Sequence, residues 1–203
     1  MKKVLGFIVL LGVLTACLEQ RELPIPAKDP ASGALIINEV ACRWTTAIPS
    51  EFQDLMRIRE QRLIGTPEEG DYPNGATKWF ELYNNSDDTI RMNDGLWYLT
   101  DDPDGEPDKN LVLSTVKIAP KNWAIVYCDT LIPSTTQIHT DFSISRRVSK
   151  IGVFFRRNNS DTLKLIDTLT YPDGVNNRTY CRFPDGNKTF TQGPPTPGAA
   201  NQQ

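Results

Sequence analysis

The sequence contains a single histidine, His139, among 203 residues. A metal centre that uses several imidazoles of one chain is therefore excluded, and any histidine-dependent catalytic triad has to use this residue. His139 lies in the segment QIHTDF, where Asp141 follows two positions later, but no nucleophile is tied to the pair by a recognisable spacing. We therefore predict that the protein is not an enzyme.

Cysteine is also scarce, with four residues in the chain. Cys17 closes an N-terminal apolar run, which leaves Cys42, Cys128 and Cys181, so at least one of these three has no partner within the chain. Cys42 and Cys128 each end an apolar, strand-like run, where cysteine commonly serves as a small buried hydrophobe. The sequence does not determine which cysteines pair. A reactive thiolate at Cys181, which has arginines nearby, is less favoured because no base is tied to it.

Only one long apolar run is present, at the N-terminus. Residues 4–13 are apolar, Lys2 and Lys3 precede them, and LTAC follows at 14–17. This order is typical of a secretory signal peptide, and the run is shorter than the roughly 20 residues that a membrane-spanning helix needs. LTAC resembles the lipobox of bacterial lipoproteins, which implies cleavage after residue 16 and lipid attachment to Cys17. The alternative is an ordinary signal peptide with a chance cysteine.

The segment after Cys17 has few apolar residues. Residues 18–32 read LEQRELPIPAKDPAS, and their three prolines and mixed charges are typical of a linker. We therefore predict a signal peptide over 1–16, a lipidated tether over 17–33 and one domain over 34–203. The predicted location is the cell envelope of a Gram-negative bacterium, at the outer membrane, on its periplasmic face or on the cell surface.

Neither sign of charge is in large excess. The chain has 22 basic and 25 acidic residues, a net charge of −3. Phosphate binding relies on clustered basic side chains, so this balance argues against nucleic acid as a partner. One cluster of basic residues would form a positive face if it flanked a hairpin, although a solvated surface is the favoured interpretation. The members of this cluster are Arg146, Arg147, Lys150, Arg156, Arg157 and Lys164.

Short strand-like segments dominate the rest of the chain. They are rich in β-branched and aromatic residues, and turn sequences such as DDPDGEPD and FPDGN separate them. The predicted strands are 34–42, 78–84, 96–101, 122–129, 150–156 and 163–171. One stretch differs, because Ser50 and Gln53 have capping-box spacing and apolar residues then recur at helical intervals. We predict an amphipathic helix over about 51–63, within an insertion over about 50–65.

Several motifs in order resemble the lamin-tail domain, an immunoglobulin-like β-sandwich. They cover about residues 34–201 and read INEV at 37–40, WFELYN at 79–84, LWYLTD at 96–101, IAP at 118–120, DTLTY at 167–171, RFPDG at 182–186 and TPG at 196–198. The resemblance implies an all-β, immunoglobulin-like β-sandwich, here with one inserted helix. Two segments depart from the family pattern, namely the insertion over 43–77 and the stretch 149–155.

Acidic side chains are the most suggestive polar group. Calcium prefers six to eight oxygen ligands, and Glu39, Glu81 and Asp101 are candidates for such a site. The ordered spacing of an EF-hand loop is absent, so the alternative is that these acids cap turns, form ion pairs or face solvent. A glycosidase-like carboxylate pair has still less support. No other cofactor is predicted.

These observations together favour a membrane-anchored, exported lipoprotein that acts as a non-catalytic binding or adhesion module. Its expected partners are the membrane, through the lipid on Cys17, and an envelope protein or extracellular polymer. Lamin-tail domains often accompany secreted nucleases or phosphatases, so an accessory role in trans with a hydrolase is one alternative. A structural envelope lipoprotein without a small ligand is the other.

Overall fold

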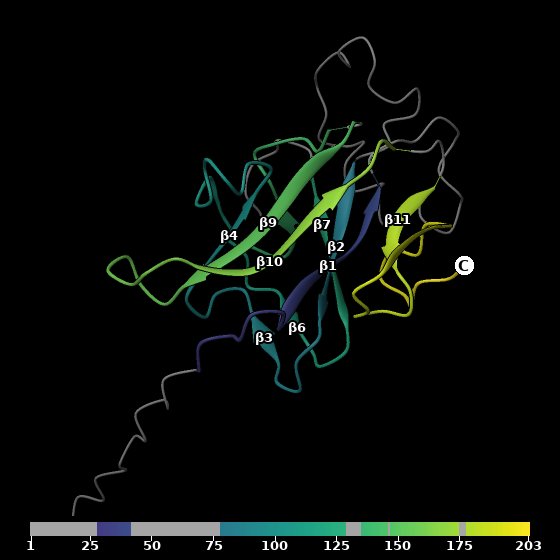
Figure 1. Cartoon of the computed structure of the whole chain (residues 1–203). Helices are drawn as coiled ribbons and strands as arrows, with labels where there is room; N and C mark the ends of the chain where they lie inside the picture. The colour runs from purple at the N-terminus through teal and green to yellow at the C-terminus, as the bar shows by residue number, and fades with distance from the viewer. Residues whose placement is uncertain (1–27, 42–77, 129–134, 146, 175–177) are drawn as a thin grey trace, which may run out of the picture.

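The computed structural model describes residues 28–41, 78–128, 135–145, 147–174 and 178–203 (Figure 1). Within these ranges the chain forms β-strands and no helix, which confirms the all-β prediction. The predicted signal peptide, Cys17, most of the tether, Cys42 and the insertion over 50–65 lie outside the described residues.

All six predicted strands are present, with bounds within two residues of those expected. They are β1 (Leu35–Ala41), β2 (Trp79–Asn84), β4 (Leu96–Thr100), β7 (Trp123–Tyr127), β9 (Ser149–Arg156) and β10 (Lys164–Tyr171). Six shorter strands complete the set: β3 (Ile90–Arg91), β5 (Asn110–Leu111), β6 (Lys117–Ile118), β8 (Ile138–His139), β11 (Thr179–Arg182) and β12 (Phe190–Gly193). The shorter strands lack the apolar alternation by which the longer ones were recognised.

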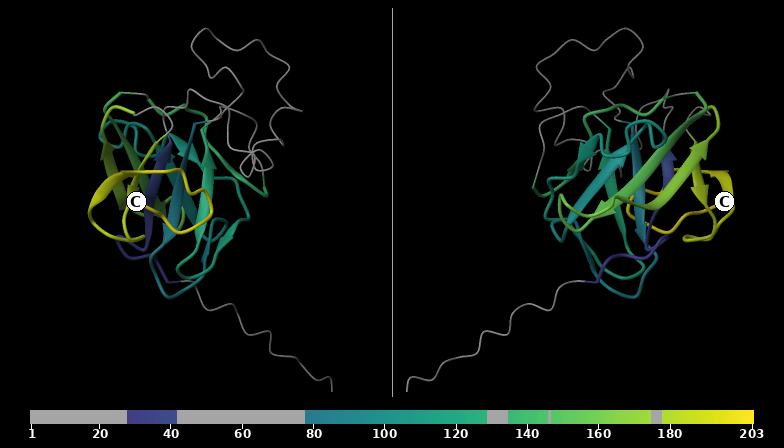
Figure 2. Two further views of the ribbon diagram at one scale, coloured as in Figure 1. Left: turned by 90° about the vertical axis from the view of Figure 1, so that its right-hand side faces the viewer. Right: turned by 60° about the vertical axis from the view of Figure 1, so that its left-hand side comes forward.

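Two sheets pack against each other across one hydrophobic core (Figures 1 and 2). The larger has the order β12-β11-β1-β2-β7-β8 and the smaller the order β10-β9-β4-β5, while β3 and β6 form a separate pair. The β7–β8 pair is parallel and the other pairs are antiparallel. The buried core draws on both sheets and includes Leu35, Phe80, Leu82, Leu99, Val153 and Phe155.

A bulge in β1 turns two consecutive side chains away from this core. Ile37 pairs with Leu82 and Glu39 pairs with Glu81, so the register shifts at Asn38. Ile37 and Val40 both belong to the core. Because side chains alternate between the faces of a regular strand, the extra residue places Asn38 and Glu39 together on the outer face. Both therefore lie beside Glu81 of the neighbouring strand.

On the edge of β1 that faces away from β2, side chains take the place of a strand partner at Ile37. Its N–H donates to Asp167 Oδ2 at 2.8 Å, and its carbonyl accepts from Arg182 Nε at 2.7 Å. Arg182 Nη2 also donates to Asp167 Oδ2 at 3.2 Å, so one ion pair joins β10, β1 and β11. Buried backbone groups need such partners, because an unpaired N–H or carbonyl costs about as much as a lost hydrogen bond.

The described chain begins at one end of the domain, here called the proximal end. Asp29 is held there by Arg157, with Nη2 and Oδ1 2.6 Å apart, and by Lys164. From this end β1 runs toward the opposite, distal end (Figure 1). The strand pairings place the end of β1, the start of β2, the turn over 101–109 and the start of β9 at the distal end.

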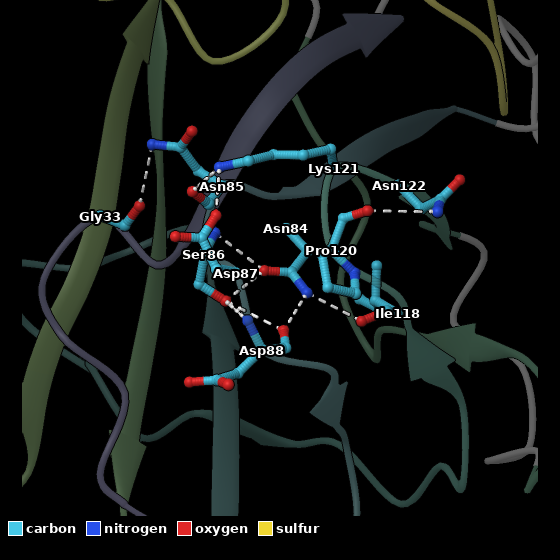
Figure 3. A network of polar contacts seen from close by, with 10 residues as sticks. All are labelled: Gly33, Asn84, Asn85, Ser86, Asp87, Asp88, Ile118, Pro120, Lys121 and Asn122. Atoms are coloured by element: carbon cyan, nitrogen blue, oxygen red, sulfur yellow. Dashed lines mark hydrogen bonds and ion pairs between the residues drawn. The ribbon is translucent and has the colours of Figure 1, made fainter.

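Asn84, at the proximal end of β2, organises the loop that follows (Figure 3). Its Nδ2 donates to the carbonyls of Asp88 and Ile118, both at 2.8 Å. Its Oδ1 accepts from the backbone N–H of Ser86 at 3.0 Å and from the Ser86 hydroxyl at 2.7 Å. All the hydrogen-bonding capacity of this buried amide is therefore used, and the terminal residue of the WFELYN motif has a structural role.

Candidate functional site

Two of the three predicted metal-ligating acids lie side by side. Glu39 of β1 and Glu81 of β2 are directly opposite in the ladder, and both residues are 0 % exposed. Asp101 lies elsewhere, in the turn after β4 of the smaller sheet, where it accepts from Lys109 Nζ at 3.0 Å. The structure thus brings Glu39 and Glu81 together on the outer face of the larger sheet and leaves Asp101 in a surface ion pair.

The Glu39 carboxyl group is surrounded by hydroxyl and backbone donors. Oε1 lies 2.6 Å from Thr179 Oγ1 and accepts from the backbone N–H of Thr196 at 3.0 Å. Oε2 lies 3.0 Å from Thr196 Oγ1. Thr179 comes from the adjacent strand β11, whereas Thr196 comes from the C-terminal segment, residues 194–203. Glu39 therefore joins this segment to the sheet.

Glu81 makes a parallel set of contacts. Its Oε2 accepts from the backbone N–H of Gly198 at 2.7 Å, and its Oε1 accepts from Asn38 Nδ2 at 3.2 Å. The same Asn38 nitrogen donates to Asp185 Oδ1 at 2.9 Å. Asp185 Oδ1 also accepts from the backbone N–H of Asn201 at 3.1 Å. The bulge residue Asn38 thus links two carboxyl groups, those of Glu81 and Asp185, and its carbonyl also contacts Asn201 of the C-terminal segment.

The C-terminal segment crosses the outer face of β1 and β2, as Figure 2 shows on the left. Ala199 N–H donates to the Thr196 carbonyl at 3.0 Å, which closes a turn with Pro197 and Gly198 at its centre. Gly198 has φ of +72°, and this combination is that of a type II turn. The turn aims the N–H groups of Thr196 and Gly198 at the two carboxyl groups.

Burial dominates the acid–base behaviour of the pair. It raises the pKa of Glu39 to about 7, although hydrogen bonds from Thr179 and Thr196 act in the opposite direction. Burial, followed by the charge of Glu39, raises the pKa of Glu81 to about 9. At neutral pH the pair therefore retains at least one proton.

The arrangement is suited to holding protein groups and protons. The carboxyl oxygens already accept N–H and O–H donors, and neither side chain is exposed. Among the residues that the structure describes, no three His, Cys, Asp or Glu side chains form a group able to hold a metal ion. Calcium prefers six to eight oxygen ligands.

Of the other candidate residues, His139 lies on the edge strand β8 and Cys128 directly follows β7, whereas Cys181 is the ladder partner of Glu39. His139 stacks on Tyr127 with ring centroids 5.2 Å apart, and its Nε2 lies 3.2 Å from Gln137 Oε1. Cys128 belongs to the hydrophobic core. Cys181 is fully buried beside the carboxyl cluster, and burial raises the pKa of its thiol to about 11, which disfavours a thiolate nucleophile.

Four basic residues of the predicted positive face, namely Lys150, Arg156, Arg157 and Lys164, have protein partners. Arg157 and Lys164 share Asp29, and Lys150 contacts Asp104. Arg156 packs over the Tyr98 ring, with its guanidinium carbon 4.9 Å from the centroid. These contacts reduce the charge that this surface offers to a phosphate backbone.

Comparison with protein-family models, with curated proteins and with solved structures finds no match. Across the described ranges, the structure has no helix that is both long and apolar enough to cross a membrane.

The pKa shifts predict that the protein loses stability as pH rises from 5.5 to 9. A carboxyl group with a raised pKa stabilises the folded state below its ordinary value, here 4.5, and this contribution is lost as pH rises through the folded-state values of about 7 and 9. We expect Glu39→Gln, which cannot ionise, to flatten this decline by on the order of 2 kcal/mol, since one pKa unit corresponds to about 1.4 kcal/mol and local relaxation limits the cost.

Urea denaturation at several pH values measures this effect. Asp101→Asn is the control, because it removes a partly exposed carboxylate that directly follows a strand of the other sheet, away from the pair. An equal pH dependence in wild type and Glu39→Gln would contradict the prediction.

Proposed function

We propose that the chain is an exported, lipid-anchored lipoprotein whose domain is a non-catalytic binding module at the bacterial cell envelope. The fold that we propose is an immunoglobulin-like β-sandwich of the lamin-tail type. Two sheets around one core, and the pairing of the INEV strand with the WFELYN strand, support this assignment. Export and anchoring rest on the N-terminal sequence that ends at Cys17.

The proposed binding role rests on the orientation of the domain relative to its tether. The chain enters at the proximal end, where Asp29 is fixed by Arg157 and Lys164. The end of β1, the start of β2, the turn over 101–109 and the start of β9 lie at the opposite, distal end. A tether that leaves from one end directs the opposite end away from the membrane. Loops held by a rigid sandwich are a common location for binding surfaces.

Two exposed apolar side chains, one at each end of the domain, test whether the distal end is the binding surface. Val148 precedes β9 at the distal end and is 64 % exposed, whereas Leu165 lies on β10 near the proximal end and is 47 % exposed. Each is replaced by glutamate in a chain that also carries Cys17→Ala, so that binding through a lipid is removed. Each purified protein is then sedimented with isolated bacterial envelopes. We expect saturable co-sedimentation, reduced at least tenfold by Val148→Glu and unchanged by Leu165→Glu.

The anchor is tested separately by cell fractionation. We expect the wild-type chain in the membrane fraction and Cys17→Ala in the soluble periplasmic fraction, because lipid chains on the cysteine supply the membrane affinity. Retention of Cys17→Ala in the membrane would contradict lipid anchoring. Absence of envelope binding would favour the structural lipoprotein instead, and stimulation of an envelope hydrolase by the unanchored chain would favour the accessory role.

A further inference from the structure

The C-terminal segment is held on the sheet mainly by polar contacts. It leaves β12 through Pro194 and Pro195, and its described residues form no strand. Thr196 and Asn201 are its buried polar anchors, 7 % and 6 % exposed. Two of its backbone N–H groups, those of Thr196 and Gly198, donate to Glu39 and Glu81. The attachment therefore depends on the state of the two carboxyl groups.

The hydrogen-bond geometry around Thr196 indicates that Glu39 carries a proton. Thr196 Oγ1 lies 2.8 Å from Asn201 Oδ1 and 3.0 Å from Glu39 Oε2, and a hydroxyl group has one hydrogen to donate. The Asn201 amide orientation is set by its Nδ2, which lies 2.8 Å from the Arg182 carbonyl and 3.4 Å from the Asn38 carbonyl. Thr196 therefore donates to Asn201, and the remaining contact is satisfied when the Glu39 carboxyl group donates to Thr196.

We propose that Glu39 and Glu81 form a proton-binding pair that locks residues 194–203 onto β1 and β2, and that loss of these protons releases the segment while the two sheets stay folded. The proton is the ligand of this site, and the C-terminal segment is the element that responds to it. This inference does not depend on the proposed binding role.

Electrostatics favour release when the pair is fully ionised. Two negative charges at facing positions of adjacent strands repel each other in a buried site, and Asp185 adds a third acid nearby. The buried guanidinium of the adjacent strand β11, that of Arg182, is already engaged with Asp167 and the Ile37 carbonyl. Release of the segment would expose the carboxylates to water and remove most of this cost.

The titratable and charged groups around the pair come from few elements. β2 adds Tyr83, whose pKa burial raises, and β11 adds Cys181, Arg178 and Arg182. The turn after β11 adds Asp185, while β12 and residues 194–203 contain no ionisable side chain. Arg178 is exposed and donates to the Gln192 carbonyl. No cation within this set is therefore free to neutralise a second carboxylate.

The sheets are expected to remain folded because the core lies on the other face. β1 keeps its pairing with β2 and β11, and Val40, Phe80 and Leu82 face the core between the sheets. None of these contacts uses the C-terminal segment. Release is thus a local opening with its own free energy.

The experiment follows methyl groups in the full chain by NMR at pH 5.5 and pH 9.5. Thr196 and Ala199 report on the segment, and Ala124 and Thr168, on β7 and β10, report on the sheets. We expect the Thr196 and Ala199 methyl groups to change from ordered to mobile, while Ala124 and Thr168 keep their order. The carboxyl carbons of Glu39 and Glu81 should titrate over the same pH range as this change.

Variants separate proton loss from a general effect of alkali. Glu39→Gln can donate to Thr196 at every pH, so its segment should stay docked at pH values where the wild-type segment is mobile. Asp101→Asn should behave as wild type. The proposal is overturned if the Thr196 methyl group keeps its order up to pH 9.5, if it changes together with Ala124, or if Glu39→Gln leaves the transition unmoved. If Glu39→Gln fails to fold, the wild-type chain tests the proposal by itself. The carboxyl carbons of Glu39 and Glu81 and the Thr196 methyl group must then change over the same pH range, and different ranges would overturn the proposal.

Discussion

Arg182→Ala is expected to lower the free energy of unfolding by about 3–5 kcal/mol, because removal of one partner leaves a buried charge without compensation. The guanidinium group donates to the Ile37 carbonyl at 2.7 Å, to the Asn187 carbonyl at 2.6 Å and to Asp167 at 3.2 Å. It also lies over the Phe190 ring, 4.4 Å from the centroid. The Arg182 side chain is 9 % exposed, so water does not readily replace these contacts.

Burial opposes both charges of this pair. It raises the pKa of Asp167 and lowers that of Arg182, while their mutual attraction acts in the opposite direction. The ion pair is therefore costly to break even though it need not stabilise the fold relative to an apolar replacement. We expect Asp167→Asn in an Arg182→Met background to recover part of the loss, since the uncompensated carboxylate is then absent.

Chemical denaturation of the single and double variants measures these effects. Arg178→Ala is the matched control, because this arginine directly precedes the same strand but is exposed and donates to the Gln192 carbonyl. Its change should stay within about 0.5 kcal/mol, as is usual for surface substitutions. A loss below about 1 kcal/mol for Arg182→Ala would mean that the Ile37 carbonyl and the Asp167 carboxylate find other hydrogen-bond partners.

Gly95→Ala is expected to destabilise the fold by about 2–5 kcal/mol, through two separable causes. Gly95 has φ of +83°, a conformation that costs a residue with a Cβ roughly 1–2 kcal/mol. A Cβ at this position would also lie 2.4 Å from Cε2 of Phe155. Phe155 packs against Trp97 with ring centroids 4.9 Å apart, so its ring cannot move without disturbing the core, and such overpacking costs about 1–3 kcal/mol more.

Gly33→Ala separates the two causes. Gly33 has φ of +75°, and nothing lies within 4 Å of the position that its Cβ would occupy. It should therefore show the conformational cost of about 1–2 kcal/mol alone. The difference between the two variants in urea denaturation gives the steric part at Gly95. Equal losses of unfolding free energy at both positions would show that the Phe155 ring moves aside without a free-energy cost.

The long strands were predictable from sequence because their residues carry a local signal. The segment KWFELYN combines aromatic and branched side chains with turn residues directly after it, and the strand Trp79–Asn84 follows this pattern closely. Strands of two residues, such as Ile138–His139, have no such signal, and their pairing depends on neighbours supplied by the fold. The apolar periodicity over 51–63 remains a prediction, because those residues lie outside the described part of the chain.

The carboxyl cluster was only half predictable for a related reason. Glu39 and Glu81 were identifiable as acids within strand sequences, but their partners Thr179 and Thr196 are 140 and 157 residues from Glu39 along the chain. The register shift at Asn38 is equally invisible in the sequence, and without it Asn38 and Glu39 would point to opposite faces. Asp101 was grouped with the pair as a third acid, from a turn rich in acidic residues, and the strand before that turn, β4, belongs to the other sheet.

The placement of β1 has a mechanical consequence. The strand starts at the end where Asp29 is fixed, and antiparallel neighbours flank its distal half on both sides, namely β2 and β11. A pulling force between the tether and the distal loops would act along the strand axis and load these hydrogen bonds together in shear, rather than peel them one at a time. Under such tension the rate of forced unfolding, more than the equilibrium stability, would set how long the domain survives.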